Sequence, residues 1–436
     1  MTAAPSLGPA AALAAAPPAV ARRSMAGSSL GLVLGKSASL ALGFVFWLVA
    51  ARLAAPADVG LAAGAVAAMM LCVLVGGVGV GAAVIGCWPA HRDRPAPLLD
   101  AATTVVAAAA TVTAGLFLAV TTAGTGSLAG LASSPAFGSV FVVLTVLGAL
   151  GVLADQASMA MGRGDEVLVR SVTFGLLVLM PLSAFAGLGA TPPVLALVGC
   201  WVGGGLGATA LAAVQLRRGT GGWVFRPWAP TGARGGTVAS LVRDGLPNHA
   251  LTIAERAPGF LLPIVVTEVL TPEANAYWYS AWMMAWVVYT VPISVGIALF
   301  AEGAREPGLL ASSTRRARRL SLALGGAAAV GLALVADVAL GLLGPAYADA
   351  GTTPLRVLLL ALVPMSALQG YYAVCRARRK LGEAVVTGAA ALAAGVGAAA
   401  AVAPHRGLVG MAGAWVGVQA VAGAWASWRL RQVGVR

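Results

Sequence analysis

Long apolar runs, separated by short polar stretches that often carry arginine, alternate along the whole chain. A helix of roughly 20 predominantly apolar residues is long enough to cross the hydrocarbon core of a bilayer. The sequence contains twelve runs of at least that length, near 27–51, 59–86, 98–123, 137–160, 167–189, 193–215, 242–266, 274–300, 320–344, 353–375, 382–403 and 407–428. The pattern therefore predicts an all-α integral membrane protein with about twelve transmembrane helices.

The basic residues predict how these helices are oriented. If the chain starts inside and the runs alternate, 23 of the 28 Lys and Arg residues fall in stretches on the inner side. Only Arg52 and Arg406 fall outside, and Lys36, Arg256 and Arg356 lie within runs. Cytoplasmic loops of membrane proteins carry an excess of Lys and Arg, and a one-span error would scramble this alternation. We therefore expect a multi-pass protein of the cytoplasmic membrane with both termini in the cytoplasm.

The longest inner connection, at 217–241, lies between two sets of six runs. It is expected to be a cytoplasmic linker between an N-terminal six-helix bundle, 26–216, and a C-terminal one, 242–430. The Ala- and Pro-rich residues 1–25 are expected to form a disordered cytoplasmic tail, and residues 431–436 a second, short tail.

The two halves also resemble each other in sequence. Residues 49–61 (VAARLAAPADVGL) and 265–277 (VVTEVLTPEANAY) both carry a Leu-x-x-Pro pattern, or nearly so, after an odd-numbered run. Their prolines, Pro56 and Pro272, are 216 residues apart, about half the chain. Because each half has an even number of spans, the predicted repeats are parallel and related by a pseudo-two-fold axis along the membrane normal.

Composition agrees with a protein that lies mostly in the bilayer. Apolar residues make up 59% of the 436 positions and charged residues only 10%, whereas charged residues approach a quarter of a soluble protein. Twelve spans leave no room for a separate soluble catalytic domain. The net charge of +13 is carried by clusters between apolar runs, which indicates membrane topology and no nucleic-acid partner.

The sequence shows no motif for a cofactor, a metal or an enzyme active site. The four cysteines form no CxxC pair, and the three histidines are scattered along the chain. There is no Asp-x-Asp motif and no nucleotide-binding loop, and the predicted external connections are short. We therefore expect a protein that is not an enzyme and that uses neither a metal nor a cofactor.

Charged residues inside the apolar runs are the best candidates for function, because each costs on the order of 3 kcal/mol near the bilayer centre. Lys36 lies about nine residues into the first run and Arg256 about fourteen residues into the seventh. Lys36 is near enough to the surface for its side chain to snorkel back, whereas Arg256 is not. Asp337 and Arg356 lie toward the outer ends of consecutive runs and are interpreted as a structural pair or as residues of the membrane interface.

The seventh run carries a polar stripe. His249, Thr252 and Arg256 share one helical face, and Asn248 and Glu255 share an adjacent face. Such a stripe is typical of the lining of a wet cavity. The structural alternative is an ion-pair network, in which Glu255 pairs with Lys36.

The repeat brings these two sites into register. Under the repeat alignment, Lys36 matches Thr252, one helical turn from Arg256. Both halves then place a cation on equivalent helices, facing the pseudo-two-fold axis if those faces point inward. A cationic, water-filled chamber between two bundles suits an anion such as a diphosphate.

Three stretches resemble the polysaccharide flippases of the multidrug/oligosaccharidyl-lipid/polysaccharide exporter superfamily. They are 31–61 (GLVLGKSASLALGFVFWLVAARLAAPADVGL), like that family's opening helix; 244–266 (DGLPNHALTIAERAPGFLLPIVV), like its seventh helix; and 342–364 (LLGPAYADAGTTPLRVLLLALVP), like its Gly-x-x-Tyr connection. The resemblance implies two six-helix bundles in a V shape that rock between inward-open and outward-open states.

The same resemblance implies a polyprenyl-diphosphate-linked sugar as substrate, whose head group crosses the cavity while the lipid tail stays in the bilayer. Lys36 and Arg256 match basic cavity positions of these flippases, and Arg52 is a lesser candidate. His249 and Asn248 are the further substrate-binding candidates from the polar stripe. We expect the protein to act as a monomer that can work beside enzymes of cell-envelope polysaccharide synthesis.

Two other classes of protein remain open at this point. A multidrug or cation antiporter of the same superfamily would favour acidic cavity residues, and Glu255 is the candidate for ion coupling in either case. A membrane glycosyltransferase, polymerase or ligase acting on the same lipid-linked substrates would need catalytic residues on a sizeable external loop. The short external connections disfavour this last class.

Overall fold

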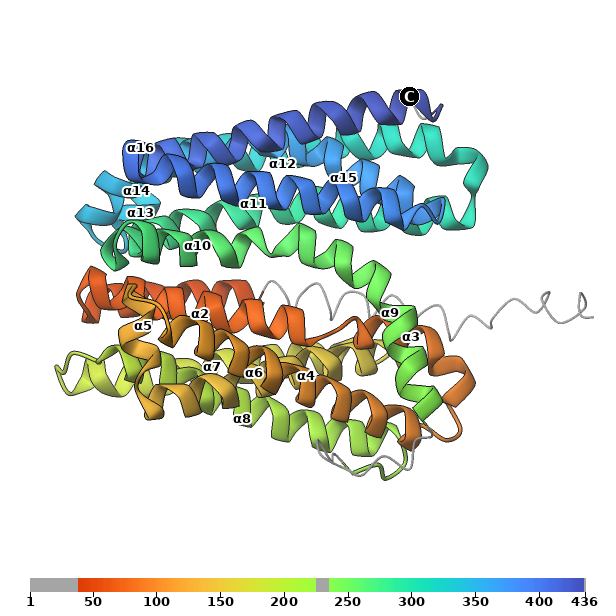
Figure 1. Cartoon of the computed structure of the whole chain (residues 1–436), viewed down its shortest axis with the longest axis horizontal. Coiled ribbons are helices and arrows are strands. Elements are labelled where there is room, and N and C mark those ends of the chain that lie inside the picture. The colour runs from red at the N-terminus through yellow and green to blue at the C-terminus, as the bar shows by residue number, and fades with distance from the viewer. Residues whose placement is uncertain (1–37, 225–234, 435–436) are drawn as a thin grey trace, which may run out of the picture.

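A computed structural model of the chain describes residues 38–224 and 235–434 (Figure 1). Within these two ranges every regular element is a helix and there is no β-strand. Lys36 and the predicted tail at 1–25 lie outside the described residues. The fold class predicted from the apolar runs is therefore confirmed.

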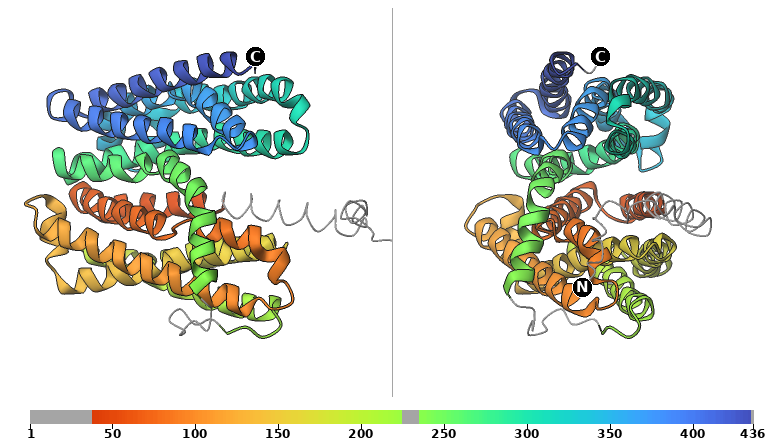
Figure 2. Two further views of the ribbon diagram at one scale, coloured as in Figure 1. Left: turned by 45° about the vertical axis from the view of Figure 1, so that its right-hand side comes forward. Right: turned by 90° about the vertical axis from the view of Figure 1, so that its right-hand side faces the viewer.

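The N-terminal lobe is built from the helix Ala38–Leu53 and seven labelled helices. These are α2 (Pro56–Gly76), α3 (Val80–His91), α4 (Ala96–Thr122), α5 (Ser127–Ala132), α6 (Pro135–Ala160), α7 (Gly164–Gly187) and α8 (Val194–Gly219). The next helix, α9 (Gly235–Arg256), begins inside the predicted linker and crosses from this lobe to the other (Figures 1 and 2).

The C-terminal lobe comprises the remaining helices. These are α10 (Pro258–Val269), α11 (Pro272–Arg305), the short 3₁₀ helix Pro307–Leu309, α12 (Leu310–Leu334), α13 (Ala336–Gly341), α14 (Pro345–Leu359), α15 (Leu362–Ala377) and α16 (Leu381–Gln432). α16 is a helical hairpin, because the chain reverses at Gly407, where φ is 58°. Its two halves meet where Gly395 lies against Trp415 and Glu383 pairs with Arg429.

Length and apolar composition qualify eight helices as membrane-spanning, or up to ten if each bent pair is one span. The second half of α16 and the shorter helix Ala38–Leu53 account for the two further spans of the predicted twelve. One bent pair is α9 with α10, which meet at 46° next to Pro258. Proline has no backbone N–H and clashes with the preceding turn, so the break at Pro258 has a direct cause.

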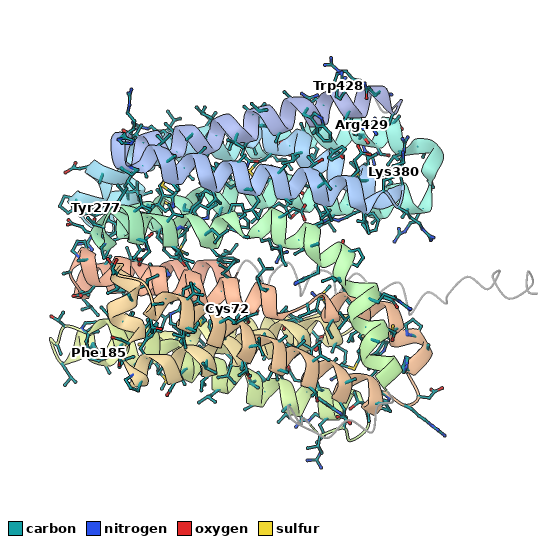
Figure 3. The ribbon with its side chains drawn as sticks, viewed as in Figure 1. Cys72, Phe185, Tyr277, Lys380, Trp428 and Arg429 are labelled. Carbon is teal, nitrogen blue, oxygen red and sulfur yellow. The ribbon has the colours of Figure 1, made fainter. Side chains whose placement is uncertain are left out.

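The helices run along one common direction and their connections gather at two ends (Figure 1). We call the end at which α3, α8 and α15 finish, at His91, Gly219 and Ala377, the arginine-rich end. Lys380 and Arg429 lie toward this end, and Tyr277 lies at the opposite end (Figure 3). The structure thus brings the basic connections together, as the alternation predicted, while the membrane orientation stays a prediction.

The hydrophobic cores explain how the two lobes are held. At the end opposite the arginines, one core is continuous across both lobes, so that Val59 and Ala62 of α2 share it with Ala276 and Trp278 of α11. We call this the sealed end. Toward the arginine-rich end the core divides in two, one in each lobe, and α9 contributes Leu241 to the first and Leu251 to the second.

Helices α2 and α11, which are equivalent in the predicted repeat, form the centre of this shared core. Both start with a proline, Pro56 and Pro272, at the first turn, where the missing N–H costs nothing. Gly60 is essential to their close approach, because a Cβ there would lie only 1.7 Å from the carbonyl oxygen of Pro272. Asn275 donates a hydrogen bond of 2.8 Å from Nδ2 to the carbonyl oxygen of Gly60.

Candidate functional site

Two adjoining cavities lie beside α9, on the arginine-rich side of the shared core. The first, of about 350 Å³, lies against the N-terminal lobe and is walled by α2, α3, α6, α9 and α10. The second, of about 220 Å³, lies against the C-terminal lobe and is walled by α9, α11 and α15. Asn248, Thr252 and Arg256 of α9 line both. We call the two together the inter-lobe cavity.

Arg256 occupies the last position of α9, at the bend into α10. Its side chain is exposed and lines both parts of the cavity. Pro258 cannot supply the N–H that would continue the helix, so carbonyl groups are left free at this terminus. A cation at the C-terminus of a helix is favoured by the helix dipole. The break thus helps the structure tolerate a charge that the sequence places deep in a span.

Glu255, the neighbour of Arg256, is held by a residue that the sequence analysis did not select. Its Oε2 lies 2.6 Å from Nη2 of Arg376 on α15, and both side chains are nearly buried, at 11% and 14% exposed. Nε of Arg376 also donates a 3.3 Å hydrogen bond to Oδ1 of Asn248. The described part of the chain thus gives Glu255 a partner in Arg376, whereas Lys36, its partner in the structural alternative, lies outside the described residues.

Arg376 belongs to the cluster Arg376–Lys380, which the topology argument treated as a purely cytoplasmic signal. The structure shows that this first residue of the cluster points into the cavity while its neighbours follow the end of α15. One signal in the sequence was available: Arg376 is the residue of the cluster nearest the apolar run. Its partner lies 121 residues away, so no local pattern reveals the pair.

The charges on the cavity wall sum to a positive value. Arg256 and Arg376 carry two positive charges, and Glu255 is the only acidic side chain among the described lining residues. Arg376 is neutralised by Glu255, whereas Arg256 forms no hydrogen bond or ion pair with its side chain in the described part of the chain. The wall therefore offers a free guanidinium group beside a paired one.

His249 and Asn248, the two other candidates on the polar stripe, both line the cavity against the N-terminal lobe. His249 packs on the break between α2 and α3, where a Cβ added at Gly79 would lie 2.9 Å from its Cβ. Gly79 has φ of 74° and lies so close to α9 that the same Cβ would be 2.4 Å from the carbonyl oxygen of Gly245. This glycine contact is where α9 rests on the N-terminal lobe.

The remaining charged candidates lie away from the cavity. Arg52 is at the sealed end, where Nε and Nη2 donate to the carbonyl oxygen of Leu342 at 2.8 and 2.6 Å. The expected pair of Asp337 and Arg356 is not formed, because Arg356 instead donates from Nε to the carbonyl oxygen of Ala333 at 3.0 Å. Among the residues that the structure describes, no group of His, Cys, Asp and Glu side chains is arranged to hold a metal ion.

Comparison with known proteins identifies the fold of this chain but does not assign it to a family. No protein-family model matches the sequence, and no curated protein matches it. Solved structures do match. A multidrug resistance MATE family transporter of the MOP superfamily, in an inward-facing conformation, superposes with a TM-score of 0.66 over 93% of this chain and 98% of that one, at 15% identity.

Two further structures extend the likeness. The lipid II flippase MurJ, in an inward closed conformation, gives a TM-score of 0.71 over 92% of this chain and 87% of its own, at 9% identity. A MOP superfamily transporter from Pyrococcus furiosus gives 0.65 over 94% and 95%, at 16% identity. The chain therefore has the fold of these multi-pass membrane transporters, none of which is described as an enzyme.

Proposed function

We propose that this chain is a transporter that flips an anionic lipid-linked oligosaccharide from the cytoplasmic to the outer leaflet by alternating access. The observation that carries the proposal is the net positive wall of the inter-lobe cavity, with Arg256 and Arg376 facing it together. Guanidinium groups bind phosphate oxygens in pairs of parallel hydrogen bonds, so the polyprenyl-diphosphate group is the part of the substrate that they would hold.

The shape of the interface supports alternating access. The lobes share one core at the sealed end and keep separate cores around the cavity at the other end. If the arginine-rich end is cytoplasmic, as the excess of basic residues predicts, this conformation is closed to the outside. A head group would enter from the cytoplasmic leaflet, and the shared core would part to release it.

Glu255 has a defined role in this proposal. In the absence of substrate its carboxylate forms an ion pair with Arg376, with 2.6 Å between Oε2 and Nη2. A diphosphate that binds Arg256 would compete with this carboxylate for Arg376, so that the substrate recruits the second guanidinium group only by displacing Glu255. The predicted contribution of Lys36 remains a further part of the proposal, carried by the sequence alone.

The alternative is a multidrug or cation antiporter, and the fold supports it equally, because the MATE family transporter superposes as well as the flippase does. The cavity argues against it. A cation site needs an acidic group that is free to bind, and Glu255 is already engaged by Arg376.

The test is translocation of a fluorescent polyprenyl-diphosphate oligosaccharide in proteoliposomes. Each charge-assisted hydrogen bond contributes about 1.5–3 kcal/mol, so Arg256→Ala and Arg376→Ala should each lower transport at limiting substrate by roughly tenfold to a hundredfold. Lys36→Ala should lower it as well. Glu255→Gln should instead tighten substrate binding, because it removes the competing carboxylate.

The matched control is Arg356→Ala, which removes an arginine whose hydrogen bond lies outside the cavity. It should transport like the wild type. Full transport by Arg256→Ala and Arg376→Ala alike would contradict the proposed site. Export of a lipophilic cation against a proton or sodium gradient, with no lipid-linked sugar moved, would establish the antiporter instead.

A further inference from the structure

A further cavity lies apart from the inter-lobe cavity. It has a volume of about 400 Å³ and lies within the C-terminal lobe, toward the arginine-rich end. Its walls come from α11, α12, α15 and the second half of α16. Nothing in the proposed transport cycle uses it.

The cavity exists because α12 and the end of α16 flank α15 without packing closely against each other. α15 packs against both, and small residues on its wall, Ala367 and Gly370, leave the space between them open. A Cβ added at Gly370 would meet no atom within 4 Å, which shows how much room the glycine leaves. Among the candidate spans, α12 is also the least buried inside the protein, with only 11% of its apolar window covered. The cavity therefore adjoins a helix surface that faces lipid.

Basic side chains line the cavity and no acidic one does, among the residues described. The guanidinium groups come from Arg315 and Arg318 on α12 and from Arg431 on α16. Two nearby carboxylates are already used elsewhere: Glu302 pairs with Arg316, and Glu383 pairs with Arg429. The side chains of Arg318 and Arg431 form no hydrogen bond or ion pair with any residue that the structure describes.

The inner part of the cavity wall is weakly polar. Ser321 of α12 and Ser366 of α15 are buried, and their hydroxyl groups form a hydrogen bond with 2.9 Å between the two Oγ atoms. Ser427 also lines the wall. Leu320 and Leu324, both about half exposed, follow Arg318 along α12. The site thus combines arginines near the helix ends, hydroxyl groups about one turn deeper and exposed apolar side chains on the same helix.

We propose that this cavity binds the phosphate head group of an anionic phospholipid from the surrounding leaflet. The phosphate would lie between Arg318 and Arg431, and the acyl chains would run toward the bilayer midplane along Leu320 and Leu324. Basic pockets between transmembrane helices on the cytoplasmic side are suited to anionic lipid head groups. A soluble phosphate shares the charge but gains nothing from the apolar surface, so the lipid is the expected occupant.

The experiment uses full-length protein in a mild detergent, with dioleoyl phosphatidylglycerol added and bound lipid counted by native mass spectrometry. Wild type should retain phosphatidylglycerol in preference to phosphatidylcholine. The double variant Arg318→Gln/Arg431→Gln should lose about tenfold in apparent affinity for phosphatidylglycerol. The control Arg305→Gln/Arg319→Gln removes the same charge at exposed positions outside the cavity wall and should bind like the wild type.

A second variant tests the cavity without changing charge. Gly370→Leu fills the space and replaces a helical glycine with a better helix former, so it should block lipid binding and leave the fold intact. Gly326→Leu, also next to open space but outside the cavity wall, is its control. Undiminished binding by both the double arginine variant and Gly370→Leu would overturn the proposal. Displacement of the lipid by millimolar inorganic phosphate would also overturn it, by showing a site for soluble anions.

Discussion

The sealed end and the crossing of α9 join the same two lobes by different means. At the sealed end α2 packs on α10 and α11 through one continuous core, reinforced by the hydrogen bond from Asn275 to Gly60. At the other end, α9 rests on α3 through the backbone contact of Gly79 with Gly245. The first contact is wide, apolar and hydrogen-bonded, whereas the second combines a close backbone contact with one buried side chain of α9, Leu241. The comparison indicates that the sealed end holds this conformation, while α9 acts as a tether between lobes.

Gly60→Leu should break the sealed end most strongly. A side chain there must displace the backbone of Pro272. Overpacking costs typically about 1–3 kcal/mol, which changes the ratio of open to sealed molecules by roughly fivefold to more than a hundredfold. Pulsed electron paramagnetic resonance between spin labels at Ser133 and Asp349, both exposed and in different lobes at this end, should show longer distances. The labels require replacement of the native cysteines.

Gly115→Leu is the control for that experiment, because a Cβ at Gly115 meets no atom within 4 Å. Its distances should match those of the parent protein. An unchanged distribution in Gly60→Leu would mean that the close approach of α2 and α11 does not keep this end shut.

Asn275→Ala tests the hydrogen bond alone and should act in the same direction with a smaller effect. Asn275 is fully buried, and its replacement removes the side-chain donor to the carbonyl oxygen of Gly60, which keeps its backbone hydrogen bond within α2. Such a hydrogen bond contributes about 0.5–1.5 kcal/mol, which is less than the overpacking at Gly60. The same two spin labels report the shift. Ser139→Ala, which removes an exposed bond to the carbonyl of Pro135, should leave the distances as they are.

Gly245→Ala probes the backbone contact between α9 and α3 and should have the smallest effect of the three substitutions. The added Cβ would lie 2.3 Å from the carbonyl oxygen of Gly79, so α9 must shift off α3. Labels at Asp93 and Glu306, exposed at the arginine-rich end, should report a broader distribution, while the Ser133–Asp349 distance stays the same. Opening of the sealed end by this variant would show that the two contacts are one cooperative unit and would remove the distinction between them.

Much of the fold follows from local pattern, and the site follows only in part. The run 242–266 predicted a span with a polar stripe, and the structure places Asn248, Thr252 and Arg256 on the cavity wall. The same run gave no sign that Arg376 would reach Glu255 from another helix. Arg52, which has the same charge as Arg256, lies outside the cavity and donates a hydrogen bond to the carbonyl oxygen of Leu342. A charged residue in a span is a candidate for function, but the sequence does not show in which direction its side chain points.

The sequence by itself determined the number of spans, their alternation and the position of the charge in the seventh span. These depend on transfer of side chains between water and lipid, a free energy that each segment carries largely alone. Only the tertiary structure decided which end is sealed, that Glu255 is held by Arg376, and that a basic cavity lies beside α12. These depend on how helices rotate and pack against partners more than a hundred residues away, where small residues such as Gly60 set the distance.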